Sequence, residues 1–128
     1  MDAKKILIVD DEEMIRKMLN LFFTENGYKV FPAENAHRAL EILKEDRCQV
    51  AFLDLNMPGM NGLDLCRKIR TSFPITCIFA ITGQASLFEL VSCRGAGFDD
   101  YFTKPFDLKQ LLKAAEDAFE KLNRWKKK

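Results

Sequence analysis

The sequence predicts an α/β fold in which five helices flank one doubly wound, five-stranded parallel sheet. Short β-rich apolar runs begin near positions 6, 28, 50, 76 and 99, and a helical pattern follows each of them. Steps of 22 to 26 residues leave room for one helix and two short loops, which is the rhythm of βαβ units. Apolar strands between one-sided helices are typical of a sheet that is buried on both faces.

The first three strand–helix units are indicated by the same signals. Their strands are predicted at residues 6–9, 28–31 and 50–53, which are rich in aliphatic and aromatic side chains. Apolar residues then recur at helical spacing after each strand, namely Ile15, Met18, Leu19 and Phe22, then Ala36, Ala39, Leu40 and Leu43, then Leu65, Cys66, Ile69 and Phe73. Asn26-Gly27 ends the first of these helices, and Pro74 ends the third.

The last two units differ in how firmly their helices are expected to pack. Residues 76–81 and 98–102 predict the fourth and fifth strands. The helix at about 86–94 has a clear apolar stripe of only Leu87, Leu90 and Val91, so we expect it to be the least firmly anchored. The final helix has the longest amphipathic pattern, formed by Leu108, Leu111, Leu112, Ala115, Phe119 and Leu122.

Composition narrows the class of protein. A chain of 128 residues that is 48% hydrophobic fits one compact domain. No stretch of 18 apolar residues is present, and the start of the chain lacks a signal-peptide pattern, so no membrane insertion is predicted. The net charge of +1 argues against direct nucleic-acid binding. The cysteines have no metal-ligand spacing and lie in or beside apolar runs, which favours a reduced, cytoplasmic protein.

The C-terminal segment is strongly basic. Lys121, Arg124, Lys126, Lys127 and Lys128 place five positive charges in the last eight positions. Cations near a helix C-terminus are favoured by the helix dipole, so a solvated helix end is one interpretation. A docking patch for an acidic partner is the other.

Polar residues follow four of the predicted strands. Asp10 and Asp11 follow the first strand, Asp54 the third, Thr82 the fourth and Lys104 the fifth. Because all strands of a parallel sheet end at the same edge, these side chains are expected to meet where such folds bind ligands. Two carboxylates 4 Å apart repel by about 4 kcal/mol at an effective dielectric near 20, so the cluster requires protons, a cation or the lysine. Oxygen ligands without histidine or cysteine favour Mg²⁺.

This combination of groups indicates phosphoryl transfer. A carboxylate can attack phosphorus as a nucleophile, while a metal ion, a lysine and a hydroxyl stabilise charge on the transferred group. Neither a Walker motif nor a GxGxxG motif is present, so a bound nucleotide is not indicated.

These residues together resemble the receiver domain of two-component response regulators. The resemblance runs through the whole chain and is carried by residues 8–12 (IVDDE), 54–62 (DLNMPGMNG), 81–83 (ITG) and 99–106 (DDYFTKPF). It implies a flavodoxin-like sheet with strand order 2-1-3-4-5, and a single receiver domain over residues 1–128.

The resemblance also implies roles for the residues at the site. Asp54 is then the phosphoacceptor, charged by a histidine kinase or a histidine phosphotransfer protein. Asp11 and Asp54 bind Mg²⁺, or Mn²⁺, through their carboxylates, Asn56 binds it through its backbone carbonyl, and Asp10 acts largely through water. Lys104 contacts the phosphoryl group.

Thr82 and Tyr101 match the switch residues of that family. The threonine would turn toward the phosphoryl group while the tyrosine turns inward, and the Lys104-Pro105 bond is expected to be cis. Plainer interpretations stay open for these positions. The acidic segment can be a helix start, Thr82 a turn residue, Tyr101 a half-buried sheet aromatic and Pro105 an ordinary trans proline.

Asn56 and Gln84 lie two residues after Asp54 and Thr82, respectively. The family varies its side chains at these positions, where they help or hinder hydrolysis of the phosphoaspartate. Both residues are amides, which can position a water but cannot act as a base. The phosphoryl lifetime is therefore left open.

The leading hypothesis is a phosphorylation switch, not a turnover enzyme, with an unknown downstream protein as its target. Phosphorylation would change the surface of the fourth helix, fifth strand and last helix, in a monomer or a phosphorylation-dependent dimer. A stand-alone regulator is favoured over a module of a longer regulator or hybrid kinase. An aspartate-nucleophile phosphatase of the haloacid-dehalogenase type is a rival, but its Asp-x-Asp pattern is missing.

Overall fold

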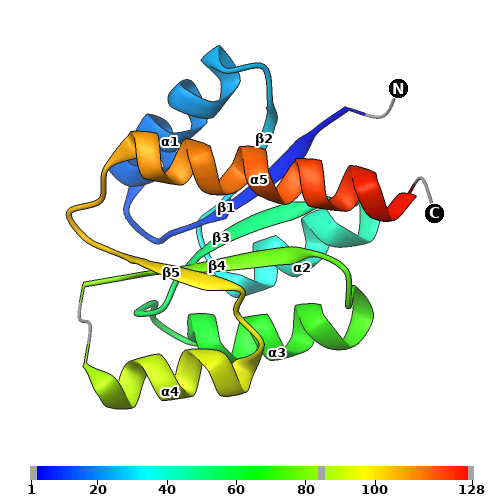
Figure 1. Ribbon diagram of the computed structural model, residues 1–128. Helices are drawn as coiled ribbons and strands as arrows, with labels where there is room; N and C mark the ends of the chain where they lie inside the picture. Colours follow the sequence, from blue (N-terminus) through cyan, green and yellow to red (C-terminus); the bar gives the residue numbers. More distant parts are fainter. Residues whose placement is uncertain (1–2, 84–85, 127–128) are drawn as a thin grey trace.

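The computed structural model describes residues 3–83 and 86–126, which form a single open sheet with helices on both faces (Figure 1). Gln84, Lys127 and Lys128 lie outside the described residues. The strands are β1 (Lys5–Val9), β2 (Lys29–Ala33), β3 (Val50–Asp54), β4 (Cys77–Thr82) and β5 (Asp100–Thr103). The helices are α1 (Glu13–Glu25), α2 (Ala36–Glu45), α3 (Gly62–Ser72), α4 (Leu87–Ala96) and α5 (Leu108–Lys126).

All strand pairs are parallel, in the order β2-β1-β3-β4-β5, so the predicted fold class and strand order are confirmed. Helices α1 and α5 cover one face of the sheet, and α2, α3 and α4 cover the other (Figure 1). Alternate residues of a strand serve the two layers: in β1, Ile6 and Ile8 pack toward α1 and α5, whereas Leu7 and Val9 pack toward α2 and α3. The strand order reverses between β1 and β3, and this is where ligands bind in such sheets.

Aromatic rings fill the layer beneath α1 and α5. The ring of Phe52 in β3 lies 5.4 Å from that of Phe23 in α1 and 5.2 Å from that of Phe79 in β4. Phe102 in β5 continues the row, 6.0 Å from Phe79. Large buried rings in offset or edge contact stabilise a core beyond their area alone. This layer therefore holds β3 firmly, and β3 carries Asp54 at its end.

Two of the predicted helix stripes were partly wrong. In α1, Met18 is 39% exposed and Phe23 is fully buried, because the core-facing side follows Leu19 to Phe23 at the i, i+4 spacing. In α4, Leu87 and Val91 are 77% and 63% exposed. The buried positions of α4 are Cys93 and Ala96, small residues that allow close packing, and the Sγ of Cys66 in α3 donates to the Ala96 carbonyl at 3.4 Å. Helix α4 therefore carries its predicted apolar stripe on the outside.

Arg70, near the end of α3, joins three segments of the chain. Its guanidinium donates to the carbonyls of Pro74 and Thr76 ahead of β4, at 2.9 and 2.5 Å, and to the carbonyl of Gly97 at 2.5 Å. It also contacts the Asp99 carboxylate at 3.1 Å, and the same carboxylate accepts the N–H of Ile78. Gly97 caps α4 with a φ of 102°, a conformation that favours glycine. These bonds fix where β4 and β5 begin.

The cysteines and the one expected cis bond agree with the sequence analysis. All four cysteines are free and buried, and burial raises the pKa of Cys48 to about 12 and that of Cys66 to about 11. They therefore act as small apolar side chains. The Lys104-Pro105 peptide is cis, as predicted. Among the described residues, no helix is long and apolar enough to span a membrane.

Candidate functional site

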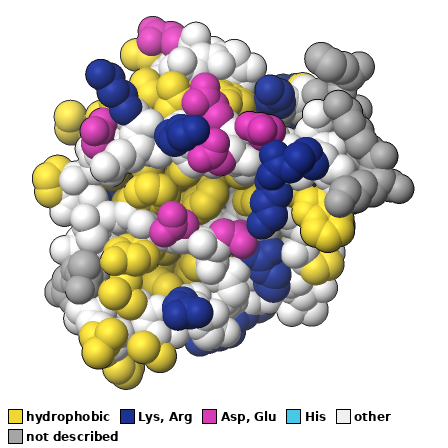
Figure 2. Space-filling model, in the orientation of Figure 1, with side chains coloured by type: hydrophobic (Ala, Val, Ile, Leu, Met, Phe, Trp, Pro, Cys, Tyr) yellow, Lys and Arg dark blue, Asp and Glu magenta, His cyan; other side chains and the backbone are white. Residues whose placement is uncertain are grey.

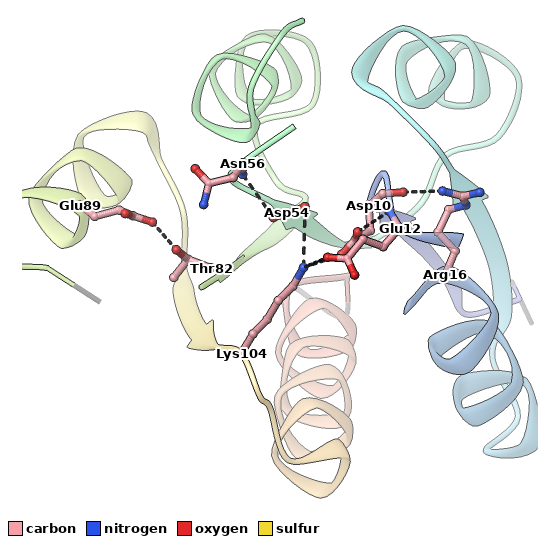
Figure 3. A network of polar contacts seen from close by, with 8 residues as sticks. All are labelled: Asp10, Glu12, Arg16, Asp54, Asn56, Thr82, Glu89 and Lys104. Carbon is pink, nitrogen blue, oxygen red and sulfur yellow. Dashed lines mark hydrogen bonds and ion pairs between the residues drawn. The ribbon is translucent and has the colours of Figure 1, made fainter. Parts of the chain in front are cut away.

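Buried polar groups gather at the carboxyl edge of the sheet. Four polar side chains are buried among the described residues, and three of them lie at strand ends: Asp10 directly follows β1, and Asp54 and Thr82 are the last residues of β3 and β4. Asp10 and Asp54 are 1% and 4% exposed. Register pairs Val9 of β1 with Leu53 of β3, so the two aspartates follow paired positions (Figure 3). The meeting of strand ends predicted from the sequence is confirmed.

Short-range bonds hold both aspartates in place. The Oδ1 of Asp10 accepts the N–H of Glu12 at 2.9 Å, and the Oδ1 of Asp54 accepts the N–H of Asn56 at 3.2 Å. Such bonds to the backbone two residues ahead turn the chain where a strand ends. Each aspartate thus shapes its loop with one oxygen and presents the other to the site. The Asn56 side chain itself is exposed.

The loop after β3 depends on one close approach. The N–H of Gly62 donates to the Leu55 carbonyl at 3.2 Å, which brings the start of α3 against the end of β3. A Cβ at Gly62 would lie closest to the Asp54 carbonyl oxygen and 2.9 Å from the Cα of Leu55. Gly62 therefore acts here as a contact point as well as a loop residue, whereas Gly59 supplies the positive φ of 78°.

Lys104 reaches into the acidic cluster from the end of β5. Its Nζ lies 3.2 Å from the Oδ2 of Asp10, 3.3 Å from Glu12 and 3.8 Å from the Oδ2 of Asp54 (Figure 3). Its backbone N–H donates to the Thr82 carbonyl at 2.8 Å, which ties this residue to β4. Nothing in the sequence pattern indicated Glu12 as a partner of this lysine.

Burial and crowding raise the proton affinity of the carboxylates. Burial raises the pKa of Asp54 to about 6, repulsion by Asp10 and a side-chain hydrogen bond with Asp11 add to the rise, and the Asn56 N–H and Lys104 oppose it. Burial likewise raises the pKa of Asp10. For Lys104, burial lowers the pKa, but Asp10 and Asp54 outweigh it and the net pKa is raised. The site therefore favours any added positive charge.

The residues present fit a divalent cation. Carboxylate oxygens of Asp10, Asp11 and Glu12 lie within 4.8 Å of one another. The Oδ2 of Asp10 is buried and, among the described residues, accepts no hydrogen bond, although the Lys104 ammonium lies 3.2 Å away as an ion pair. Three carboxyl groups, those of Asp10, Glu12 and Asp54, lie within 4 Å of Lys104, and Asp11 lies beside them. Hard oxygen donors of this kind suit Mg²⁺ or Mn²⁺.

Thr82 lies at the same edge but points away from the acidic cluster. Its hydroxyl donates to the Glu89 carboxylate of α4, on the far side from Asp54 (Figure 3). Glu89 was missed in the sequence analysis. It is the fourth residue of a Ser-x-x-Glu sequence of the capping-box type, and the Ser86 Oγ accepts the Glu89 N–H at 3.1 Å. That pattern predicts a helix start, and nothing in it indicates a bond to Thr82.

The other switch candidate lies at the surface. Tyr101 in β5 is 36% exposed. Exposed apolar side chains also protrude from α4, where Phe88 is 82% exposed; they stand out at the lower left of the molecule (Figure 2). The site thus has a buried polar centre. Helix α4, which exposes apolar side chains, is bonded to this centre through Glu89 and Thr82.

A model of the response regulator receiver domain matches residues 6–116. The chain belongs to this family. Response regulator MprA of Mycolicibacterium vanbaalenii is 38% identical over 108 residues, which are 84% of this chain and 47% of the relative. The same regulator of Mycobacterium ulcerans is 39% identical over a segment of that length. The chain thus spans about half the length of the curated relatives it matches.

Solved receiver structures have the same fold. A CheY-like receiver domain of Methanospirillum hungatei matches with a TM-score of 0.91 and 29% identity over 96% of this chain and 98% of that one. The chemotaxis protein CheY4 of Vibrio cholerae gives a TM-score of 0.87 and 28% identity over 91% and 99% of the two chains. The recognition of a receiver domain of two-component signal transduction is thereby confirmed.

Proposed function

We propose that this receiver domain is a phosphorylation switch in which Asp54 accepts the phosphoryl group. The observation that carries the proposal is a buried carboxylate of raised pKa at the end of β3, with Lys104 3.8 Å away and an acidic cluster beside it. One oxygen of Asp54 is committed to the Asn56 N–H, and the Oδ2 faces the lysine. This leaves an aligned nucleophile and a neighbouring positive charge.

The proposed reaction transfers a phosphoryl group from a phosphohistidine of a histidine kinase or a histidine phosphotransfer protein. A bond forms between a carboxylate oxygen of Asp54 and phosphorus, and the nitrogen–phosphorus bond of the donor breaks. The imidazole leaving group takes up a proton, and the product is an aspartyl phosphate. Lys104 stabilises negative charge on the phosphoryl oxygens throughout.

Asp11 and Asp54 would hold Mg²⁺ through their carboxylates, Asn56 through its backbone carbonyl, and Asp10 through water. When bound, the ion neutralises charge on the transferred phosphoryl oxygens. The buried Asp10 oxygen without a hydrogen bond and the excess of carboxylates support this assignment.

We expect Mg²⁺ to raise the urea midpoint of unfolding of the wild-type chain, because the ion binds the folded state. It should raise the midpoint far less in Asp11→Asn, which lacks one of the proposed ligands.

Phosphorylation would act on partners by changing the surface formed by α4, β5 and α5. In the proposed switch Thr82 leaves Glu89, turns toward the phosphoryl group and releases α4, while Tyr101 turns inward. The exposed side chains of Leu87, Phe88 and Val91 would belong to the surface read by a downstream protein or by a second copy. In this proposal the added charge at Asp54 changes the balance between two arrangements of Thr82 and α4.

We further propose that residues 1–128 act as one domain in a reduced, cytoplasmic setting, supported by one continuous sheet and four buried free cysteines. The matched regulators are about twice as long, which supports the alternative of a receiver module within a longer regulator. Turnover of small phosphate esters is not expected, since the second residue after Asp54, where aspartate-nucleophile phosphatases have another aspartate, is Asn56.

Mass spectrometry after incubation with acetyl phosphate tests the proposal. We expect the wild-type chain to gain one phosphoryl group in the presence of Mg²⁺ and none in the presence of a chelator. Asp54→Asn should abolish the gain, and Asp64→Asn, at an exposed aspartate of α3, should leave it unchanged. Uptake that persists in Asp54→Asn, or that needs no metal, contradicts the mechanism.

Glu89→Ala is expected to favour the switched state. Hydrogen bonds to charged groups contribute about 1.5–3 kcal/mol, so loss of this acceptor should shift the switching equilibrium at least about tenfold. The measurement is an NMR spectrum at subsaturating acetyl phosphate. It gives the fraction of the Thr82 methyl signal that has the chemical shift of the phosphorylated chain. Glu89→Gln retains an acceptor oxygen and should shift it less. Equal fractions in wild type and Glu89→Ala would exclude Glu89 from the switch.

A further inference from the structure

A groove of about 1100 Å³ lies at the opposite edge of the sheet from Asp54. It is bordered by the amino ends of β1, β2 and β4, by the loop after α3 and by the last turns of α5. Strand β3 separates the two edges by five residues, or about 16 Å at 3.3 Å per residue. The groove is therefore separate from the phosphorylation site, and its function does not rest on the function proposed above.

The lining of the groove is strongly basic. Of the described residues that line it, six are cationic and one is acidic; the cations are Lys5, Lys29, Arg47, Arg70, Lys121 and Lys126. The single carboxylate, Asp99, is already bound by Arg70 at 3.1 Å, and Lys5 pairs with Asp46 at 3.2 Å. Within residues 3–83 and 86–126, Lys29, Arg47 and Lys121 form no ion pair. Cations that line one groove without a carboxylate partner favour an anionic ligand there.

The groove also offers uncovered apolar surface. Ile75 is 62% exposed and Trp125 is 67% exposed, and Pro74 and Leu122 lie in the same lining. Basic side chains run down the side of the molecule next to the C-terminal end of α5, with hydrophobic side chains beside them (Figure 2). An aromatic side chain beside cations is a frequent energetic centre of protein interfaces.

We propose that this groove binds an acidic peptide segment that carries an apolar anchor residue. Its acidic side chains would pair with Lys29, Arg47 and Lys121, and the anchor would cover Trp125 and Ile75. The volume of about 1100 Å³ exceeds the range of small-molecule sites, which is about 300–1,000 Å³. Single-stranded nucleic acid needs several stacking aromatics, whereas Trp125 is the one aromatic among the described residues of the lining. An acidic peptide with an apolar anchor would pair with the cations and cover the exposed side chains of Ile75 and Trp125.

Trp125 is the only tryptophan of the chain, so its fluorescence reports directly on the groove. The probe is a short synthetic peptide of aspartate and glutamate with one central leucine, added to the full chain without phosphodonor or Mg²⁺. We expect a saturable change in emission that weakens with added salt, since exposed charge pairs are screened. The same peptide with alanine at the centre should bind more weakly, and a lysine-rich counterpart should not bind.

Charge reversal at two groove cations provides the decisive comparison. Arg47→Glu combined with Lys121→Glu should weaken peptide binding by at least about tenfold, which corresponds to 1.4 kcal/mol. Lys109→Glu is the matched control on the same helix, about 18 Å from Lys121 at 1.5 Å per residue, and should bind as wild type does. No emission change with the acidic peptide, an undiminished affinity in the double variant, or tighter binding of a single-stranded oligonucleotide would each overturn the proposal.

Discussion

Gly62→Ala is expected to destabilise the chain by about 3 kcal/mol and to abolish phosphoryl uptake, although the residue carries no chemical group. Its added Cβ would meet the carbonyl oxygen of Asp54 and the Cα of Leu55, which are backbone atoms and cannot rotate away. Helix α3 must then move from the end of β3, or the end of β3 must bend. Either shift displaces the Asp54 carboxylate from Lys104.

Urea unfolding and acetyl phosphate labelling measure the two effects of Gly62→Ala. Gly95→Ala is the matched control, because Gly95 lies in α4 with nothing within 4 Å of a built Cβ. It should be neutral or stabilise the chain by about 0.5–1 kcal/mol, since alanine favours a helix interior. A Gly62→Ala chain that is as stable as wild type and fully phosphorylated would refute the proposed close contact.

Asp54→Asn should stabilise the metal-free chain by about 2 to 3 kcal/mol at pH 8. The folded chain holds the pKa of Asp54 at about 6, above the ordinary 3.8, because burial and Asp10 disfavour the charged form. The folded state therefore binds more protons than the unfolded state between these values. The stability associated with protonated Asp54 is complete below pH 3.8 and is lost as the pH rises through 6. An amide at this position avoids that loss.

The pH dependence of the stability gain tests whether it comes from the raised pKa of Asp54. Urea unfolding in a chelator should give a gain in Asp54→Asn that is largest above pH 7 and disappears near pH 4. Asp117→Asn, which removes an exposed aspartate paired with Lys113, is the control, because exposed ion pairs contribute little to stability. A gain in Asp54→Asn that is independent of pH, or that grows toward acid, contradicts the raised pKa.

Features fixed by strand ends could be predicted from the sequence. Apolar runs and their spacing determine which residues leave the sheet at its carboxyl edge, so Asp10, Asp54, Thr82 and Lys104 could be brought together before any coordinates. The cis bond before Pro105 also followed, through the family resemblance. The roles assigned to these residues remain proposals.

Features that depend on side-chain direction could not be predicted. The bond between Thr82 and Glu89 depends on a rotamer, and the Ser-x-x-Glu pattern accounts for the glutamate without it. The outward stripe of α4 misled the pattern analysis because Leu87 is apolar yet 77% exposed, while the buried contacts come from small residues such as Ala96. In the sequence, Gly62 is an ordinary turn residue. Its close approach to the backbone of Asp54 and Leu55 is visible only in the folded chain.

The placement of charge has a consequence for how the molecule meets its partners. A net charge of +1 suggests an electrically neutral body, yet four carboxyl groups crowd one end of the sheet, and three cations that form no ion pair among the described residues, Lys29, Arg47 and Lys121, lie at the other. These two clusters together contribute an electric dipole along the strands. An approaching protein that is itself charged would be rotated into one of two orientations before contact, over about the 8–10 Å that physiological salt permits. Speed of encounter would then depend on polarity along the strands more than on the total charge.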